Sequence, residues 1–250
     1  MKEIKLKAHA KINIALDVLG KKPDGYHDVR MIMQTIDLYD KLKIKSVSGP
    51  KIEIITNLPY LPIDQRNLVY QIIDSLIKKH HIEEGIEVDL YKMIPVAAGL
   101  AGGSTDAAAA ILGMNELFEL GMTMDEMALF AKGFGADIPY CLYGGTALAE
   151  GIGEELMFLQ PFPECYVVIA KPKFSVSTAY VYRNLVINEE TKHPDVDGII
   201  TSINASRKDI IGSLMGNVLE SVTAREYAII NELKATFIKS GAFGTLNSGS

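Results

Sequence analysis

Cysteine is scarce in this sequence. Its 250 residues include two cysteines, Cys141 and Cys165, which stand in unlike contexts, and neither belongs to a Cys-x-x-Cys pair. Zinc sites and disulfide frameworks depend on recurring, closely spaced cysteines. The sequence therefore indicates neither a structural zinc site nor a disulfide-stabilised fold.

Long apolar runs are also missing. No run approaches the roughly 20 residues of a transmembrane helix. The N-terminal stretch MKEIKLKAHAKINIAL alternates charged and apolar residues and lacks the apolar core of a secretory signal. We therefore expect a soluble cytoplasmic protein with no membrane partner.

An excess of positive charge is the third absence. The formal net charge is -6 at pH 7, from 25 Lys and Arg against 31 Asp and Glu. Nucleic-acid binding needs a basic surface, so the sequence argues against a nucleic-acid partner. With 48% hydrophobic and 22% charged residues, the chain can form a substantial core and is expected to be globular.

Hydrophobic periodicity predicts an α+β fold of two lobes. We predict strands at 2–8, 11–19, 29–46 (with a turn near Tyr39–Asp40), 86–91, 145–158, 164–171 and in the late AFGTL segment. We predict helices at 67–81, in the Ala-rich segment after Ser104, and at 123–133, 177–186, 206–222 and 225–240. The lobe boundary is placed near Pro161–Pro163, which gives an N-terminal domain of residues 1–160 and a C-terminal domain of residues 161–250.

The strongest chemical signal is a run of small residues, PVAAGLAGGSTDAAAA, from Pro95 to Ala110. Small side chains let backbone N–H groups approach a phosphate, and a helix N-terminus attracts anions. Ser104 is predicted as the N-cap of the Ala-rich helix. The run is neither a Walker A loop nor a Rossmann fingerprint. By itself it also fits a capped, closely packed helix in which Asp106 only offsets the helix dipole.

The run is similar to the second motif of the GHMP kinases, P-x-x-x-G-L-x-x-S-[ST]-[ND]-A. Three further stretches resemble one branch of that superfamily, the 4-diphosphocytidyl-2-C-methyl-D-erythritol kinases: AKINIALDVLGKKPDGYHDV, FGADIPYCLYGGTALAEGIGE and KPKFSVSTAYVY. These stretches follow the family's order across nearly the whole chain. Together they make the resemblance specific.

The resemblance implies a two-lobed kinase that uses ATP with Mg²⁺. It implies phosphorylation of a hydroxyl of a cytidine-diphosphate-linked methylerythritol, in non-mevalonate isoprenoid synthesis. It also implies an ATP site made by Pro95, Val96, Ala97, Ala98, Gly99, Leu100, Ala101, Gly102, Gly103, Ser104, Thr105 and Asn67, although Asn67 could simply cap the helix that it opens.

The sequence departs from the family pattern at two places. Ala97, Ala98 and Ala101 stand where some relatives have glycine, which keeps the loop small. The final residues NSGS resemble the opening of a third motif, G-[ST]-G-[PA]. We therefore expect a C-terminal domain that is incomplete at Ser250.

The resemblance implies two catalytic residues. Asp137, in GADIP, matches the family's catalytic base, although most aspartates in such settings cap helices or turns. Lys11 would lie near the acceptor hydroxyl and Asp137, although a lone lysine in a strand is usually solvated. Asn13 would share the face of Lys11 and contact the substrate, or else be an outward-facing polar residue.

The resemblance also implies a cytosine site. Tyr26 would stack on the base, Tyr182 would lie on its opposite face, and His27 would hydrogen-bond its edge. Thr178 falls near the substrate on weaker grounds. Without the resemblance, these side chains would be taken as exposed or as ordinary helix packing. His80, His81 and His193 lack metal-ligand spacing, so we predict that they are solvated and that the protein offers no metal site of its own.

Two other functions stay open. A GHMP kinase for another alcohol, such as mevalonate or homoserine, would share the loop and the catalytic pair, but the GYH sequence and Tyr182 favour a cytidyl substrate. A non-catalytic relative would be expected to lose Lys11, Asp137 or Ser104, and all three are present. The oligomeric state cannot be inferred from the sequence.

Overall fold

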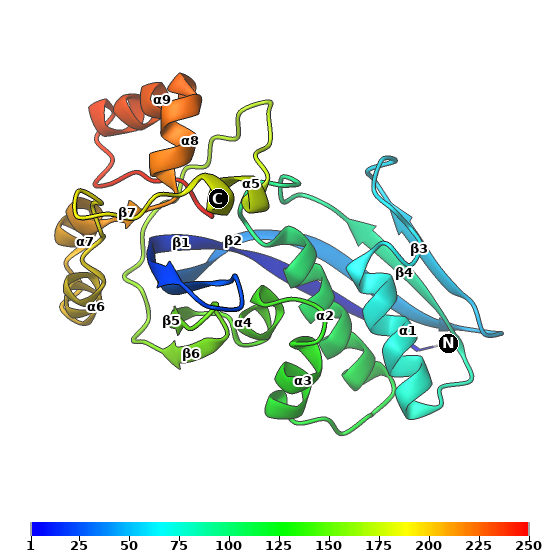
Figure 1. The fold of residues 1–250 in the computed structure, drawn as a ribbon. Helices are drawn as coiled ribbons and strands as arrows, with labels where there is room; N and C mark the ends of the chain where they lie inside the picture. The colour runs from blue at the N-terminus through cyan, green and yellow to red at the C-terminus, as the bar shows by residue number, and fades with distance from the viewer. Residues whose placement is uncertain (1, 250) are drawn as a thin grey trace. The chain divides into compact units, whose positions relative to one another are not determined.

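A computed structural model of the chain describes residues 2–249 (Figure 1). These residues form two compact units. Unit 1 comprises the chain up to Lys11, Ile36–Val96 and Ala101–Gly144, and unit 2 comprises Ile12–Thr35, Ala97–Leu100 and the chain from Gly145. The units thus divide the chain differently from the predicted boundary near Pro161–Pro163, because the two long N-terminal strands contribute residues to both.

Those two strands are β1 (Glu3–Lys21) and β2 (His27–Val47). The predicted turn near Tyr39–Asp40 is wrong, since β2 continues through it. Asp40 is fully buried in the strand, where its carboxylate accepts hydrogen bonds from the N–H groups of Met93 and Ile94. A turn-favouring residue can therefore stay in an extended strand, because its side chain is satisfied elsewhere.

In unit 1, four helices cover one face of the strands (Figure 1). Strand β3 (Ile52–Thr56) runs parallel to β4 (Gly85–Tyr91), which pairs antiparallel with residues 41–47 of β2. The helices are α1 (Leu68–His80), α2 (Gly102–Leu117), α3 (Met124–Ala131) and α4 (Asp137–Tyr143). The predicted helices at 67–81 and 123–133 are confirmed as α1 and α3, whereas α4 was not predicted.

Close packing in unit 1 depends on the small residues of α2. Ala107, Ala108, Ala109 and Ala110 are all buried in the core cluster that also includes α1 residues such as Ile72. A Cβ atom at Gly113 would lie 2.7 Å from Ile44 Cδ1. Because the side chains on this face of α2 are small, the helix can pack closely against its neighbours and against the strands.

In unit 2, short strands pair with the remaining parts of β1 and β2. Strand β5 (Thr146–Glu150) pairs antiparallel with residues 31–34 of β2 and with β6 (Glu155–Phe158), and β7 (Gly216–Asn217) runs parallel to residues 15–16 of β1. The helices are α5 (Thr178–Asn184), α6 (Val196–Asn204), α7 (Lys208–Leu214), α8 (Glu220–Glu226) and α9 (Ala228–Lys239).

Several predictions for unit 2 are wrong. Residues 164–171 form no strand, and the side chains of Tyr166 and Val168 are exposed, so alternation without a pairing partner did not produce a ladder. The predicted helix at 206–222 is interrupted because Gly216 and Asn217 pair with β1. The AFGTL segment is not a strand, and α6 was not predicted. The helices near 177–186 and 225–240 are confirmed.

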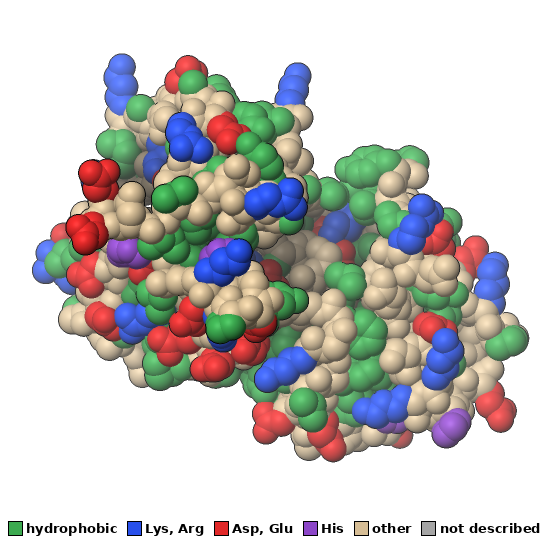
Figure 2. All heavy atoms as spheres, viewed as in Figure 1, with side chains coloured by type: hydrophobic (Ala, Val, Ile, Leu, Met, Phe, Trp, Pro, Cys, Tyr) green, Lys and Arg blue, Asp and Glu red, His purple; other side chains and the backbone are tan. Residues whose placement is uncertain are grey.

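The mixture of sheets and helices confirms the predicted α+β class. Over residues 2–249, no helix has the length and apolar character needed to cross a bilayer. On the face drawn in Figure 2, Lys and Arg side chains are interspersed with Asp and Glu rather than gathered into one basic area.

Candidate active site

Lys11 and Asp137 lie together in unit 1. Lys11 Nζ is 3.9 Å from Asp137 Oδ2, and the Lys11 side chain is 7% exposed while that of Asp137 is 35% exposed. Lys11 projects from β1, and Asp137 is the first residue of α4, followed by Pro139 in the first turn, where a missing N–H costs no helix bond. The pair thus offers a carboxylate that can accept a proton and an ammonium that can offset negative charge.

The small-residue loop leads into α2 by a constrained path. Ala97, Gly99 and Ala101 have φ angles of 52°, 71° and 55°. Two alanines in the left-handed region are uncommon, and such conformations persist only where the surrounding structure imposes them.

The prediction that Ser104 caps α2 is wrong. The N-cap is Ala101, which makes no side-chain cap hydrogen bond, and Ser104 is the third residue of the helix. Gly102 and Gly103 enter the helix early because Ala101 already makes the turn. The first N–H groups of α2 therefore lack a side-chain acceptor from the cap, which is the arrangement that favours an anion at a helix N-terminus.

The side chain of Thr105 faces the protein interior, and its role in ATP binding stays a prediction. It is 3% exposed, and its hydroxyl donates to the carbonyl of His9 at 2.6 Å. Its side chain also acts on the Cys141 thiol, as do the charges of Asp137 and Lys11, while burial, the largest effect, raises the pKa of this thiol to about 12. The first turn of α2 and the Lys11–Asp137 pair are therefore neighbours, with an unreactive thiol beside them.

Within unit 2, the middle of the loop is packed against the late chain. Ser248 Oγ donates to the carbonyl of Gly99 at 3.1 Å and accepts from the N–H of Asn13 at 3.2 Å. Asn217 Nδ2 donates to the carbonyls of Asn247 and Gly249 at 2.9 and 2.6 Å, which holds this segment in place. Ser250, the last residue of the predicted third motif, lies outside the described residues.

Asn13 is not an outward-facing polar residue. It is fully buried, and its Nδ2 lies 3.4 Å from Met31 Sδ. A buried amide is costly unless it is hydrogen-bonded. Its contact with substrate stays a prediction.

The predicted cytosine-site residues are only partly brought together. The rings of His27 and Tyr182 have centroids 4.8 Å apart and are tilted by 35°. Burial, and then the positive charge of Lys21, lower the pKa of His27, which favours a neutral imidazole. Tyr26 is 61% exposed, and Thr178 is the first residue of α5. Stacking of a base by Tyr26 and Tyr182 stays a prediction.

Asn67 is the N-cap of α1, which was the alternative to a role in the ATP site. Its side chain accepts from the N–H of Val69 at 2.9 Å, and its Nδ2 donates to the carbonyl of Pro62 at 2.8 Å. Both ends of the amide are thus used within unit 1. A role of Asn67 in nucleotide binding stays a prediction.

The histidines predicted to be solvated differ from one another. His81 is exposed, but Nε2 of His80 is shielded from solvent, and His193 Nδ1 lies 2.6 Å from the buried carboxylate of Asp17. The solvated interpretation is therefore wrong for Nε2 of His80, whereas the His193 side chain is 41% exposed and only its Nδ1 is engaged by Asp17. The sequence gives no signal for the partner of His193, because Asp17 is 176 residues away in the chain.

Sequence reasoning missed Lys92 and Asp40. The Lys92 ammonium lies against the carboxylates of Asp40 and Asp106 and donates to the carbonyl of Gly102 at 3.2 Å. One signal was available: Lys92 lies shortly before the small-residue run that begins at Pro95, and Asp40 interrupts the alternation of an otherwise continuous strand. Charged residues in such positions need a buried partner.

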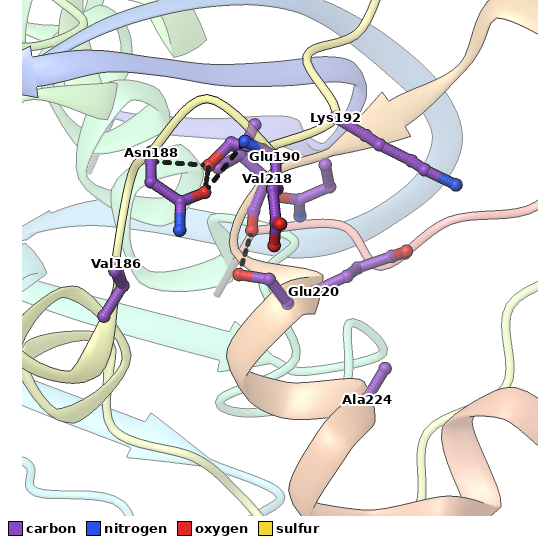
Figure 3. Close-up of a pocket in the computed structure, with 10 residues that line it drawn as sticks. Val186, Asn188, Glu190, Lys192, Val218, Glu220 and Ala224 are labelled. Carbon is purple, nitrogen blue, oxygen red and sulfur yellow. Dashed lines mark hydrogen bonds between the residues drawn. The ribbon is translucent and has the colours of Figure 1, made fainter.

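A further pocket in unit 2 contains none of the predicted site residues (Figure 3). It has a volume of about 490 Å³, and its walls include Asn188, Thr191 and Glu220. Thr191 Oγ1 accepts from the N–H of Asn188 at 2.9 Å, and Glu220 pairs with Lys234 and accepts from the N–H of Asn247. Its polar groups thus hold the surrounding structure together.

Comparisons with known proteins first define the class. The family model for the GHMP kinases N terminal domain matches residues 67–145, which contain α1, α2 and Asp137. The crystal structure of a homoserine kinase from Cytophaga hutchinsonii shares the fold, with a TM-score of 0.69 and 21% identity over 99% of this chain and 83% of that chain.

Closer relatives narrow the class. The 4-diphosphocytidyl-2-C-methyl-D-erythritol kinase of Lachnoclostridium phytofermentans is 51% identical over 247 residues, 99% of this chain and 85% of that protein. The crystal structure of a 4-(cytidine 5'-diphospho)-2C-methyl-D-erythritol kinase has a TM-score of 0.80 and 27% identity over 98% of this chain and 87% of that chain. The chain belongs to the 4-diphosphocytidyl-2-C-methyl-D-erythritol kinase family of GHMP kinases, which confirms the resemblance seen in its motifs.

Proposed function

We propose that this chain transfers the γ-phosphoryl group of ATP to a hydroxyl of 4-diphosphocytidyl-2-C-methyl-D-erythritol and gives its 2-phosphate. The reaction would belong to non-mevalonate isoprenoid synthesis in the cytoplasm. The observation that carries the proposal is the Lys11–Asp137 pair next to the first turn of α2, a turn without a side-chain cap. The names of the family's members supply the acceptor.

The chemistry follows from these groups. The acceptor oxygen attacks the γ-phosphorus, the bond from that phosphorus to the β-γ bridging oxygen breaks, and ADP leaves. Asp137 Oδ2 orients the hydroxyl and takes its proton, while the Lys11 ammonium offsets negative charge on the phosphoryl oxygens. Positioning and charge neutralisation contribute most in phosphoryl transfer, so the fixed first turn of α2 is as important as the base.

Mg²⁺ fits this site as an ion carried by ATP. Among residues 2–249, no three His, Cys, Asp or Glu side chains gather to form a cage for a metal. Mg²⁺ usually binds substrate phosphates with one or two protein oxygens, and Asp137 and Ser104 offer such oxygens near the first turn of α2. When bound, the ion would neutralise charge on the phosphates.

Acceptor specificity would come from unit 2. His27 has a lowered pKa and lies beside Tyr182 with its ring tilted, so its neutral ring can hydrogen-bond a base edge. We propose that Tyr26 completes the cytosine site and that Asn13 and Thr178 contact the remaining part of the substrate. The small-residue loop that begins at Pro95 and leads into α2, which we call the phosphate loop, would serve any acceptor alcohol, as would the Lys11–Asp137 pair.

The test is Mg²⁺-dependent ATP turnover with the cytidyl substrate, mevalonate and homoserine as separate acceptors, with the product identified by ³¹P NMR. Asp137→Asn should lower turnover by roughly 10²–10⁴. Asp89→Asn, the same change at an exposed position on β4, is the matched control and should retain activity. Efficient phosphorylation of mevalonate or homoserine in place of the cytidyl substrate would overturn the proposal.

A further inference from the structure

Lys92 stands at the centre of a buried charge cluster that the proposed reaction does not use. Its side chain is 4% exposed, and those of Asp40 and Asp106 are 0% and 5% exposed. Lys92 Nζ contacts Asp40 Oδ2, lies 2.5 Å from Asp106 Oδ2 and donates to the carbonyl of Gly102 at 3.2 Å. One ammonium thus links β2 to two positions in the first turns of α2.

The backbone of Lys92 is held as firmly as its side chain. Its N–H donates to Asn57 Oδ1 at 2.7 Å, and its carbonyl accepts from Asn57 Nδ2 at 3.0 Å. Asp40 Oδ1 accepts from the N–H groups of Met93 and Ile94, which continue the chain toward the phosphate loop. The ammonium is therefore fixed relative to the segment before the loop and to the helix after it.

Gly102 has little space on the side of Lys92. A Cβ atom there would lie 3.3 Å from Lys92 Nζ and 3.1 Å from Ile94 Cγ2. The first residue of α2 is thus packed directly on the ammonium. Because the carbonyl of Gly102 accepts from Lys92, movement of this side chain would move the helix turn that we propose as the phosphate site.

We propose that Lys92 is a positioning residue for ATP, which sets the first turn of α2 in the conformation that receives the phosphates; this inference rests on the proposed kinase function. A salt bridge needed only for folding would not explain the third bond, from the ammonium to the carbonyl of Gly102. Lys92 acts through α2 and does not itself touch the reacting atoms. The carboxyl groups of Asp40 and Asp106 keep the long side chain in one rotamer, so the turn is ordered before ATP arrives.

The proposal is tested with Lys92→Met. Lys92→Gln is the second variant, to be used if Lys92→Met does not fold, because the glutamine amide can still donate a hydrogen bond. Lys45→Met is the matched control, because Lys45 forms an ion pair with Glu87 in the same unit at a more exposed position. Two quantities are measured: calorimetric affinity for a non-hydrolysable ATP analogue with Mg²⁺, and KM for ATP and for the acceptor separately.

We expect folded Lys92→Met, or Lys92→Gln, to weaken analogue binding and to raise KM for ATP by about tenfold or more, since charged hydrogen bonds of this kind are typically worth that factor. KM for the acceptor should change less than twofold, and Lys45→Met should match the unmodified chain. Folded variants with unchanged analogue affinity would overturn the proposal. An unmodified chain that binds the analogue but phosphorylates no acceptor would overturn the proposed function alone.

Discussion

Substitution of Gly99 by alanine should disturb the phosphate loop more than its small size suggests. Gly99 has φ of 71°, and a Cβ atom there would lie 1.7 Å from the carbonyl oxygen of Ser248. Ordinary contacts begin near 3.4 Å, so the two backbone segments must separate by well over 1 Å. The flexible end of a side chain could move aside at little cost, but a backbone carbonyl held by its neighbours cannot.

Two effects contribute to the expected cost. The left-handed conformation itself costs alanine roughly 1–2 kcal/mol. Ala97 and Ala101 already adopt this conformation in the same loop, so that cost is tolerable here. The contact with Ser248 adds an overpacking cost of about 1–3 kcal/mol. A displaced loop should also lower kcat/KM for ATP by roughly 10², the usual effect of a misplacement of about 1 Å.

Gly121→Ala separates these two effects. Gly121 has φ of 68°, but a Cβ atom there would meet nothing within 4 Å. This control carries the conformational cost without the steric one. Thermal unfolding and ATP kinetics of both variants should show the larger loss in both quantities for Gly99→Ala. Equal losses of stability, with kcat/KM unchanged in Gly99→Ala, would refute the argument that Ser248 supports the loop.

Three further outcomes are expected. Lys11→Met should lower turnover in the kinase assay, because the negative charge of the transition state is left unscreened; a near-normal rate would remove Lys11 from the chemistry. Tyr26→Ala should raise KM for the cytidyl substrate by roughly ten- to a hundredfold, as for loss of one base-stacking contact, with KM for ATP unchanged; an equal loss for both substrates would mean that Tyr26 supports the fold. Burial raises the pKa of Asp106 from 3.8 to about 8, although Lys92 lowers it, so the folded state binds this proton more tightly than the unfolded state. The resulting stability should be complete below about pH 4 and be lost as pH rises through 8, and urea unfolding of Asp106→Asn between pH 5 and 9 should lack this loss.

Sequence periodicity predicted the elements whose hydrophobic pattern is local. The apolar stripe of α1 and the small residues of α2 are local patterns. Helix α1 lies where its pattern placed it, and α2 is present but begins before the predicted cap at Ser104. Lys11 and Asp137 were expected to meet from the family motifs, and they do, at 3.9 Å. Spacing alone could not bring together residues 126 positions apart in the chain.

The failures share a physical cause. Tyr39–Asp40 was predicted as a turn and 164–171 as a strand because each segment was judged by its own residues. Asp40 stays in a strand because distant N–H groups and Lys92 satisfy its carboxylate. Residues 164–171 form no strand because none of the described residues pairs with them. The presence of remote partners decides the first case and their absence decides the second, and the propensity of a segment carries no information on either.

The same cause explains why the small-residue loop before α2 could be located from the sequence but its support could not. Small residues before an Ala-rich helix are visible in one stretch of sequence. Their support comes from separate segments: Lys92 and Asp40 hold the first turn of α2, and Ser248 holds Gly99. Each of these residues is polar, and each is bonded to backbone or to a buried charge in the structure. A loop that adopts three left-handed angles needs such support, because its own residues would not choose that conformation. The residues that fix the loop are therefore as informative about its function as the loop itself.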